Sequence, residues 1–178
     1  MKLITNNYIL KTLNTDYISD ILIYYKNNSD FHKFSMPMKN DDFFSEKNFV
    51  YMIQEEEKLL NLGQFYRFFI FRKNTFNILG DVSIYDIRYG NISSCFLGIK
   101  IDKESTNKGI ASEVLECIIN FIKNDLKLHS IRATILPNNS KSISLFEKNG
   151  FQFDGVIRHL FKSENGWEDH FLYSLILK

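Results

Sequence analysis

The sequence contains only two cysteines, two prolines and one tryptophan among its 178 residues. Two cysteines cannot form a disulfide framework, and the spacing of Cys95 and Cys117 suits no metal site. We therefore expect both to be reduced core residues of a cytoplasmic protein. No repeat, low-complexity tract or linker interrupts the chain, so residues 1–178 are expected to form a single domain.

Strong charge of one sign is also missing. The net charge is +1, and no block of lysine or arginine stands out, so direct nucleic-acid binding is not expected. The first seven residues contain no apolar run of signal-peptide length, and no segment approaches the roughly 20 apolar residues of a membrane-spanning helix. We expect no membrane partner, and the sequence leaves a monomer and a homodimer equally open.

Aromatic residues, in contrast, are abundant. Seventeen phenylalanines and nine tyrosines contribute to an aromatic content of 15%, which predicts an aromatic-rich core. The hydrophobic content of 44% and charged content of 24% are typical of a globular protein.

Hydrophobic periodicity predicts an α/β (mixed α+β) fold, with one mixed sheet of about seven strands flanked by helices. Strands are expected at 8–13, 65–72, 78–87, 94–101, 130–136, 151–161 and 167–177. Helices are expected at 16–25, 43–62, 108–124 and 139–149, and a loop at 31–42. The run Glu55-Glu56-Glu57-Lys58 is most simply a solvated helix face.

The segment from Thr106 to Ala111 connects a predicted strand to a predicted helix. Gly109 stands where the helix opens, and Lys108 precedes it. A helix start offers unpaired N–H groups and the positive end of the helix dipole, an arrangement that suits a phosphate. An ordinary strand-to-helix connection would look the same, so this loop alone does not decide the function.

The second half of the chain carries several motifs in a fixed order: Cys95-Phe96-Leu97-Gly98 to Ala111, Asn139-x-x-Ser142 to Gly150-Phe151, Asp154-Gly155-x-x-Arg158, and Gly166-Trp167-x-Asp169-His170. Together they resemble the GNAT acetyltransferases, and within them the RimJ/RimL branch of ribosomal-protein alanine N-acetyltransferases, closest to the RimJ side. The resemblance covers about residues 94–177.

The resemblance implies the GNAT fold, a twisted, mostly antiparallel sheet with splayed central strands, and acetyl-CoA as the acetyl donor. The strand with Leu97, Ile99 and Ile101 would diverge from 130–136 and pair with the pantetheine amides. The pyrophosphate would lie on the loop Thr106, Asn107, Lys108, Gly109, Ile110 and Ala111. The family usually has Gln or Arg at position 106 and Gly at 107. Asparagine tolerates a positive φ, so the turn should survive.

Asn139 and Ser142 match the family's N-x-x-S positions near the thioester, although Asn139 could equally serve as a helix cap. Phe146, also counted with the cofactor residues, stands where many family members have a tyrosine acid and cannot donate a proton. Ser142 is therefore the candidate proton donor to the leaving thiolate.

For the base, the resemblance points to the two C-terminal strands. RimL-like members carry a glutamate at the position of Phe161; His159, two residues earlier on the same expected strand face, could replace it with Asp169 nearby. The alternative is that His159 and His170 are surface histidines and that Asp169 pairs with Arg158.

The acceptor remains open between the N-terminal α-amine of a protein, such as a ribosomal protein, and a small amine, such as a polyamine, an amino acid or an aminoglycoside. Removing the proton of an α-amine at pH 7 costs about 1 kcal/mol, against about 5 kcal/mol for lysine. A site without a strong base therefore favours the α-amine. A protein that binds CoA without turnover is the third hypothesis.

Overall fold

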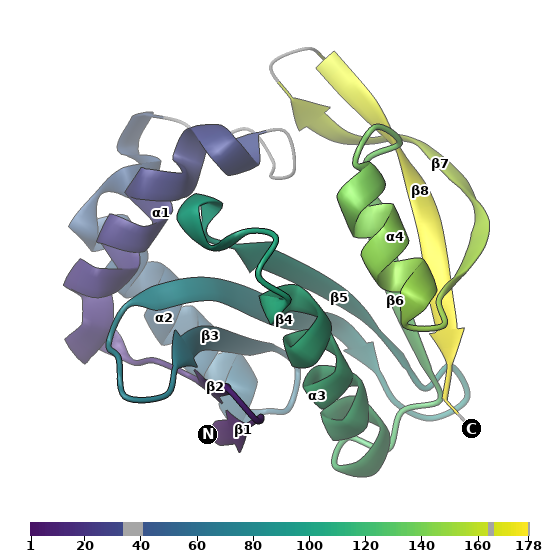
Figure 1. The fold of residues 1–178 in the computed structure, drawn as a ribbon, viewed down its shortest axis with the longest axis horizontal. Helices are drawn as coiled ribbons and strands as arrows, with labels where there is room; N and C mark the ends of the chain where they lie inside the picture. The colour runs from purple at the N-terminus through teal and green to yellow at the C-terminus, as the bar shows by residue number, and fades with distance from the viewer. Residues whose placement is uncertain (34–40, 164–165, 178) are drawn as a thin grey trace.

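The computed structural model describes residues 1–33, 41–163 and 166–177 (Figure 1). Its strands are β1 (Lys2–Ile4), β2 (Tyr8–Lys11), β3 (Tyr66–Arg72), β4 (Ile78–Arg88), β5 (Ser94–Ile101), β6 (Ser130–Ile135), β7 (Gln152–Ser163) and β8 (Gly166–Ile176). Its α-helices are α1 (Ile18–His32), α2 (Glu46–Asn61), α3 (Ile110–Asn124) and α4 (Ser140–Lys148). Short 3-10 turns are η1 (Thr15–Tyr17), η3 (Asp41–Phe44) and η4 (Lys103–Ser105).

The eight strands form one mixed sheet in the order β1-β2-β3-β4-β5-β6-β8-β7. Neighbouring strands are antiparallel except β5 and β6, which run parallel. The mixed sheet was predicted with about seven strands, and the additional strand is β1. It contains three residues and pairs only with β2 among the described strands, so it is too short to produce a readable alternation.

Two helices cover each face of the sheet (Figure 1). The face under α3 and α4 carries the larger apolar core, in which Phe68, Ile84, Leu97 and Ile118 are almost fully buried. The alternation of β3 places its other side chains on the opposite face, where Phe69 packs with residues of α1 and α2. This second face includes buried charges, which are described below.

Several boundaries differ from the predicted ones. The first helix continues to His32, seven residues beyond the predicted end, so Phe31 and His32 are helical and not part of a loop. The rest of the predicted loop at 34–40, and Glu164 and Asn165 in the turn between the last two strands, lie outside the described residues. In the part of the chain that is described, no helix has the length and apolarity needed to cross a membrane.

Candidate functional site

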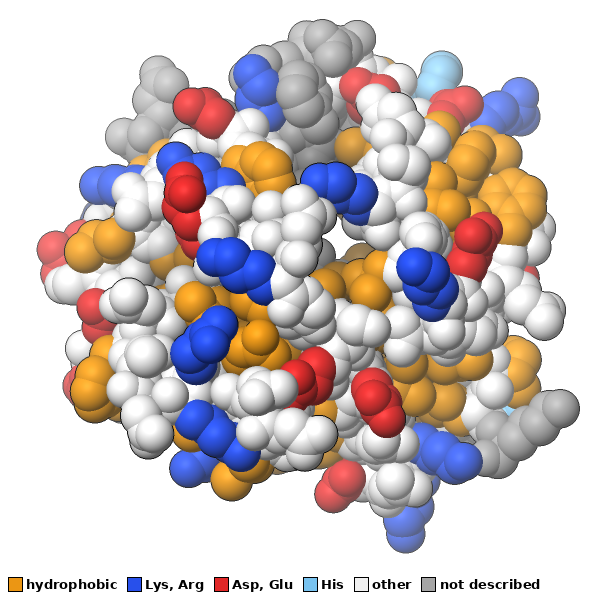
Figure 2. Space-filling model, viewed as in Figure 1, with side chains coloured by type: hydrophobic (Ala, Val, Ile, Leu, Met, Phe, Trp, Pro, Cys, Tyr) orange, Lys and Arg blue, Asp and Glu red, His pale blue; other side chains and the backbone are white. Residues whose placement is uncertain are grey.

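The central feature of the site is the divergence of β5 from β6. The two strands share three register pairs, Ser94–Ser130, Cys95–Ile131 and Phe96–Arg132. β5 then continues to Ile101 and β6 to Ile135 without further pairing between them. Figure 2 shows a hollow in the surface between the α3 side and the α4 side, with hydrophobic side chains at its floor. The predicted splay of the central strands is confirmed.

The side chains of the diverging part of β5 alternate between the two faces. Leu97 is 2% exposed and, with Ile99, packs in the core beneath α3. Both residues therefore present only their backbone toward β6. The predicted pairing with the pantetheine amides requires this orientation. Ile101 differs, because its carbonyl is already 3.0 Å from Nε2 of His32 in α1.

The loop before α3, residues 106–111 (the anion loop), has a backbone conformation that suits an anion. Asn107 (φ 60°) and Gly109 (φ 77°) adopt the left-handed conformation, so asparagine does preserve the turn, as predicted. Gly109 is the N-cap of α3, and no side chain among the described residues caps the helix there. The first N–H groups of the helix, from Ile110 and Ala111, consequently lack intrahelical acceptors.

Two side chains of the same loop fold back onto it. Nζ of Lys108 donates to the carbonyl of Glu104 at 2.6 Å, and Oγ1 of Thr106 donates to the carbonyl of Lys103 at 3.2 Å. Asn107, Lys108 and Gly109 are exposed. The loop therefore offers its backbone to solvent, while Thr106 and Lys108 brace its shape.

At the start of α4, Oδ1 of Asn139 accepts a hydrogen bond from the N–H of Ser142 at 3.2 Å. Asn139 is thus the cap that the spacing suggested. Ser142 is half-buried in the first turn. Phe146 is 3% exposed, and its ring packs edge-on against Phe151 with centroids 4.8 Å apart, so its side chain belongs to the core.

The hairpin of β7 and β8 differs from the regular alternation on which the choice of His159 rested. The register shifts between Ile157 and Phe161, and His159 has a φ of 52°. The argument that His159 shares a face with Phe161 is therefore wrong, because a bulge interrupts the alternation. The His159 side chain is exposed, and its backbone N–H donates to Oδ1 of Asp169 at 2.9 Å.

His170 is not a surface histidine, contrary to the alternative interpretation. Its side chain is 3% exposed, its ring lies edge-on to Phe161 with centroids 5.0 Å apart, and Nδ1 is 3.2 Å from the carbonyl of Glu168. Asp169 has its recorded hydrogen bond with His159 and not with Arg158. The glutamate position of RimL-like members is thus occupied by a phenylalanine that packs on a buried imidazole.

On the face opposite α3, small residues line the centre of the sheet. Ser83 and Gly98 are register partners on β4 and β5, and a Cβ added to Gly98 would have Cε1 of Tyr85 as its nearest neighbour, at 3.8 Å. Tyr85 stacks on Phe96 with ring centroids 5.8 Å apart and also interacts with Thr134 of β6. This leaves room beside the unpaired part of β5 on the side away from the anion loop.

Next to these small residues lies a buried cluster of charges that the sequence did not reveal. Arg67 of β3 forms ion pairs with Glu56 of α2 at 2.7 Å and with Asp81 of β4 at 3.6 Å. Asp81 is 1% exposed and also accepts a hydrogen bond from the Tyr24 hydroxyl at 3.0 Å. Arg67 additionally donates to the Tyr25 hydroxyl.

The charge cluster corrects the prediction of a solvated face at residues 55–58 for Glu56 alone, because Glu57 and Lys58 are exposed as predicted. Burial raises the pKa of Glu56, and the Arg67 guanidinium opposes this shift. Burial also lowers the pKa of Lys100, which is the register partner of Asp81, although Asp81 counteracts it. No local pattern in the sequence indicates these contacts, because the partners come from α1, α2, β3, β4 and β5.

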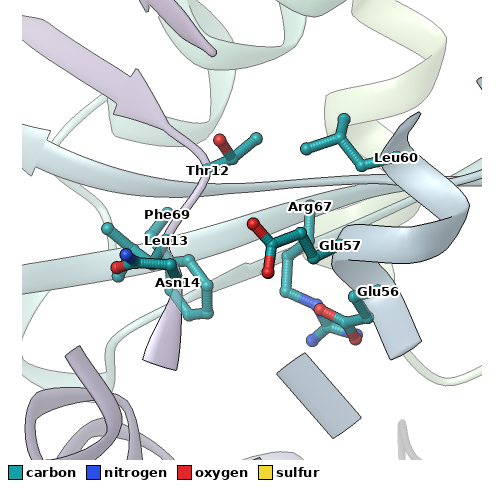
Figure 3. A pocket seen from close by; sticks show the side chains of 8 residues that line it. All are labelled: Thr12, Leu13, Asn14, Glu56, Glu57, Leu60, Arg67 and Phe69. Carbon is teal, nitrogen blue, oxygen red and sulfur yellow. The ribbon is translucent and has the colours of Figure 1, made fainter. Parts of the chain in front are cut away.

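Beside this cluster is a cavity of about 280 Å³ between the end of β2, α2 and β3 (Figure 3). Glu56 and Arg67 point toward each other at its wall, and Glu57 points into it. Its wall includes Arg67, whose Nε is the one buried side-chain N or O atom in the described residues without a hydrogen-bond partner. The cavity does not include residues of β5 or β6, so it is separate from the strand opening.

Comparison with known proteins agrees with this geometry. Residues 8–152 match the family model of the acetyltransferase (GNAT) domain. The chain is 30% identical over 162 residues to the probable N-acetyltransferase YjcK of Bacillus subtilis, covering 91% of this chain and 89% of that protein.

Two solved structures are similar in fold. A ribosomal-protein-S5-alanine acetyltransferase from Vibrio fischeri has a TM-score of 0.93 at 23% identity, covering 100% of this chain and 97% of that one. Mycobacterium smegmatis RimJ, in complex with CoA-disulfide, has a TM-score of 0.88 at 19% identity, covering 95% of this chain and 81% of that one.

Proposed function

This chain belongs to the GNAT acetyltransferase family and is an acetyl-CoA-dependent N-acetyltransferase, and we propose that its acceptor is the N-terminal α-amine of a protein in the cytoplasm. The similarity to a ribosomal-protein-S5-alanine acetyltransferase, which extends over the whole chain, supports a ribosomal protein as that acceptor.

The residues of the strand opening fit acetyl-CoA. The unpaired backbone of Leu97 and Ile99 can bond to the pantetheine amides as a neighbouring strand would. The uncapped start of α3, with Asn107 and Gly109 in left-handed conformation, can bind the pyrophosphate through backbone N–H groups. We propose that Thr106 and Lys108 act by bracing this loop, with Ile110 and Ala111 supplying N–H groups.

The choice of acceptor rests on the ion pairs formed by the two carboxylates of the charge cluster, Glu56 and Asp81. Glu56 and Asp81 are both ion-paired with Arg67, so neither carboxylate can turn toward an incoming amine without breaking its ion pair, even though burial raises the pKa of Glu56. An α-amine loses its proton at pH 7 at a cost of about 1 kcal/mol, whereas a lysine side chain requires about 5 kcal/mol. A site whose nearby carboxylates are ion-paired is therefore better suited to an α-amine.

For the chemistry, we propose that Ser142 donates a proton to the departing thiolate and that the exposed ring of His159 accepts the amine proton through water. Asp169 would keep the bulge in position, because it accepts the backbone N–H of His159. A backbone N–H of the free part of β5 would polarise the thioester carbonyl. Asn139 would orient the first turn of α4, and with it Ser142.

The second candidate is a small-amine acetyltransferase. Its support is Glu57, which is exposed, lines the cavity on the side of the sheet away from the anion loop and, unlike Glu56 and Asp81, is not ion-paired with Arg67; a carboxylate there would attract a polyamine. A CoA-binding protein without turnover would bind CoA and release no thiol with any amine.

The test uses a peptide that begins with alanine and contains one internal lysine, incubated with acetyl-CoA and the purified protein. Mass spectrometry then locates the acetyl group. Acetylation of the N-terminus alone supports the proposal, and the same peptide with a blocked N-terminus is the control. Acetylation of the lysine at a similar rate, or of spermidine in preference to both, contradicts it.

A further inference from the structure

A single buried amide joins α1 to the turn that precedes the anion loop. Asn28 is 2% exposed, and its Nδ2 donates to the Tyr24 carbonyl at 2.8 Å and to Oδ1 of Asp102 at 3.0 Å. Its Oδ1 accepts the backbone N–H of Lys103 at 2.8 Å. Both polar atoms of the Asn28 side chain therefore form hydrogen bonds. Two of these three bonds reach a turn more than seventy residues away in the sequence.

The turn that Asn28 holds is the end of β5 and η4. Oδ2 of Asp102 accepts the N–H of Glu104 at 3.1 Å, and the Asp102 carbonyl accepts the N–H of Ser105 at 2.8 Å. The N–H of Asp102 donates to the carbonyl of Leu79 on β4 at 2.8 Å. Hydrogen bonds thus connect Asp102 to β4 of the sheet, to α1 and to its own turn.

The side-chain hydrogen bonds that brace the anion loop run to this turn. Lys108 donates to the Glu104 carbonyl and Thr106 to the Lys103 carbonyl, so both braces of the loop end on residues of η4. A shift of η4 would therefore move Asn107 and Gly109. α1 provides a firm anchor, because Ile21 is fully buried against the sheet and His32 contacts the Ile101 carbonyl.

We propose that Asn28 is a positioning residue for CoA: through the turn at 102–105, it holds the loop at the start of α3 in the conformation that binds the pyrophosphate. This inference rests on the proposed use of that loop by acetyl-CoA. It assigns to α1, on the face of the sheet opposite α3, a part in cofactor affinity. Loss of the amide would remove the hydrogen-bond partner of the Lys103 N–H and of Oδ1 of Asp102.

The test is a titration of the full chain with CoA by calorimetry, together with thermal unfolding. Asn28→Ala is expected to raise the Kd for CoA about tenfold, which corresponds to about 1.4 kcal/mol. Asn28→Asp is expected to have a similar effect, because its carboxylate would face that of Asp102. The KM for the acceptor should change little in both variants.

A reciprocal exchange separates positioning from general destabilisation. In the double variant Asn28→Asp/Asp102→Asn the amide and the carboxylate change places. The amide introduced at position 102 then donates to the carboxylate introduced at position 28, which still accepts the Lys103 N–H; the bond to the Tyr24 carbonyl, which lies within α1 and does not reach the turn, is not restored. The Kd of the double variant should return to within about threefold of wild type. The matched control is Tyr24→Phe, which loses a buried hydrogen bond from the same helix but has no contact with the turn, and its Kd should equal that of wild type.

Two results overturn the inference: an unchanged Kd in Asn28→Ala, whether or not its Tm falls, or a double variant that binds as weakly as the single ones. Failure of the wild type to bind CoA would instead refute the proposed function itself, so the two failures are distinguishable.

Discussion

Phe96 of β5 and Arg132 of β6 are register partners, and they are the last pair that joins these two described strands. From this point the two strands diverge, and the backbone of β5 lacks a neighbour on the β6 side. The consequence is a gap bordered by a free strand edge and, a few residues later, by the uncapped start of α3. We propose that these two features bind acetyl-CoA through backbone atoms, so that a loop without the family's usual side chains can still perform this role.

Gly109→Val should weaken CoA binding specifically. Valine is strained at a φ of 77°, and its side chain would occupy the space that an anion needs beside the helix start. We expect the Kd for CoA to rise by at least about tenfold, or about 1.4 kcal/mol, in a calorimetric titration.

Gly90→Val provides the matched control for Gly109. Gly90 has a φ of 76°, and a Cβ at either glycine would meet no atom of the described residues within 4 Å. Both variants should lose similar stability, about 1 kcal/mol. Equal effects of the two substitutions on the CoA Kd would contradict the assignment of the anion loop.

Gly98→Leu should block the acceptor while leaving CoA binding intact. The side chain would extend into the space beside Tyr85 on the face opposite α3, whereas the β5 backbone remains available to pantetheine. We expect kcat/KM for the acceptor to fall by about a hundredfold, or about 2.7 kcal/mol, with the CoA Kd unchanged. Gly98→Ala, whose Cβ has room at 3.8 Å, should retain most activity; a Gly98→Leu enzyme with normal kcat/KM would show that the acceptor enters elsewhere.

Ser142→Ala should reduce kcat more than it changes cofactor affinity. A positioned proton donor contributes about 10²-fold or more to the rate. The variant keeps the backbone N–H that Asn139 caps, so α4 should form normally. Steady-state thiol release measures kcat; Ser144→Ala, an exposed serine of the same helix, is the control. Equal rates in the two variants would remove Ser142 from the mechanism.

His159→Ala should lower kcat/KM for the amine by about tenfold at pH 7, because the exposed imidazole is the proposed proton acceptor. The loss should be partly recovered at higher pH, where the amine is neutral without assistance. The measurement is a pH profile of kcat/KM for His159→Ala, His129→Ala and wild type. His129 is also exposed but precedes β6, away from the β7–β8 hairpin that carries His159. The pH profile of His129→Ala should therefore equal that of wild type.

His170→Ala gives the contrasting outcome for the same step. His170 is buried against Phe161, and in the present account it stabilises the hairpin and transfers no proton. The His170→Ala substitution should lower the Tm and leave the shape of the pH profile of kcat/KM unchanged. If His170→Ala abolishes the acidic limb of the profile while His159→Ala does not, the base is His170.

The sequence predicted the strand, turn and helix around Gly109 because that signal is local. Ile110, Val114, Leu115 and Ile118 repeat at helical spacing, and they are all buried in the structure. The left-handed Asn107 followed from the known tolerance of asparagine. Helices and strands with this kind of local pattern appeared close to their predicted positions.

The predictions were wrong where the position of a residue depends on a partner far away in the sequence. Glu56 looked like one of three solvated glutamates, and only the position of Arg67 on a neighbouring strand explains its burial. His159 was assigned to a face by alternation, but its positive φ and the register shift around it break that alternation. Asn28 carries no signal of its own, since its partners lie at Asp102 and Lys103.

Arg67→Met should destabilise the protein by about 3–5 kcal/mol, because two buried carboxylates lose their cation. Burial already raises the pKa of Glu56, and removing Arg67 raises it further above the unfolded value. The folded variant then binds the proton more tightly than the unfolded chain. Its stability is therefore greatest at low pH and falls as the pH rises through the folded pKa.

The measurement for Arg67→Met is urea unfolding between about pH 5 and pH 8, with the gap from wild type widening toward pH 8. The control is Arg88→Met, which removes an exposed ion pair with Asp86 and should cost at most about 1 kcal/mol at any pH. A constant gap for Arg67→Met across this range would mean that Glu56 and Asp81 do not depend on its charge.

The central claim is transfer of an acetyl group to an N-terminal α-amine, and its most direct measurement is the initial rate of CoA thiol release with competing acceptors. An alanine-initiated peptide, the same peptide with a blocked N-terminus, and spermidine would each be titrated against saturating acetyl-CoA. We predict a kcat/KM for the free peptide at least about a hundredfold above the other two, or about 2.7 kcal/mol. A kcat/KM for spermidine or the blocked peptide that equals or exceeds it would contradict the account.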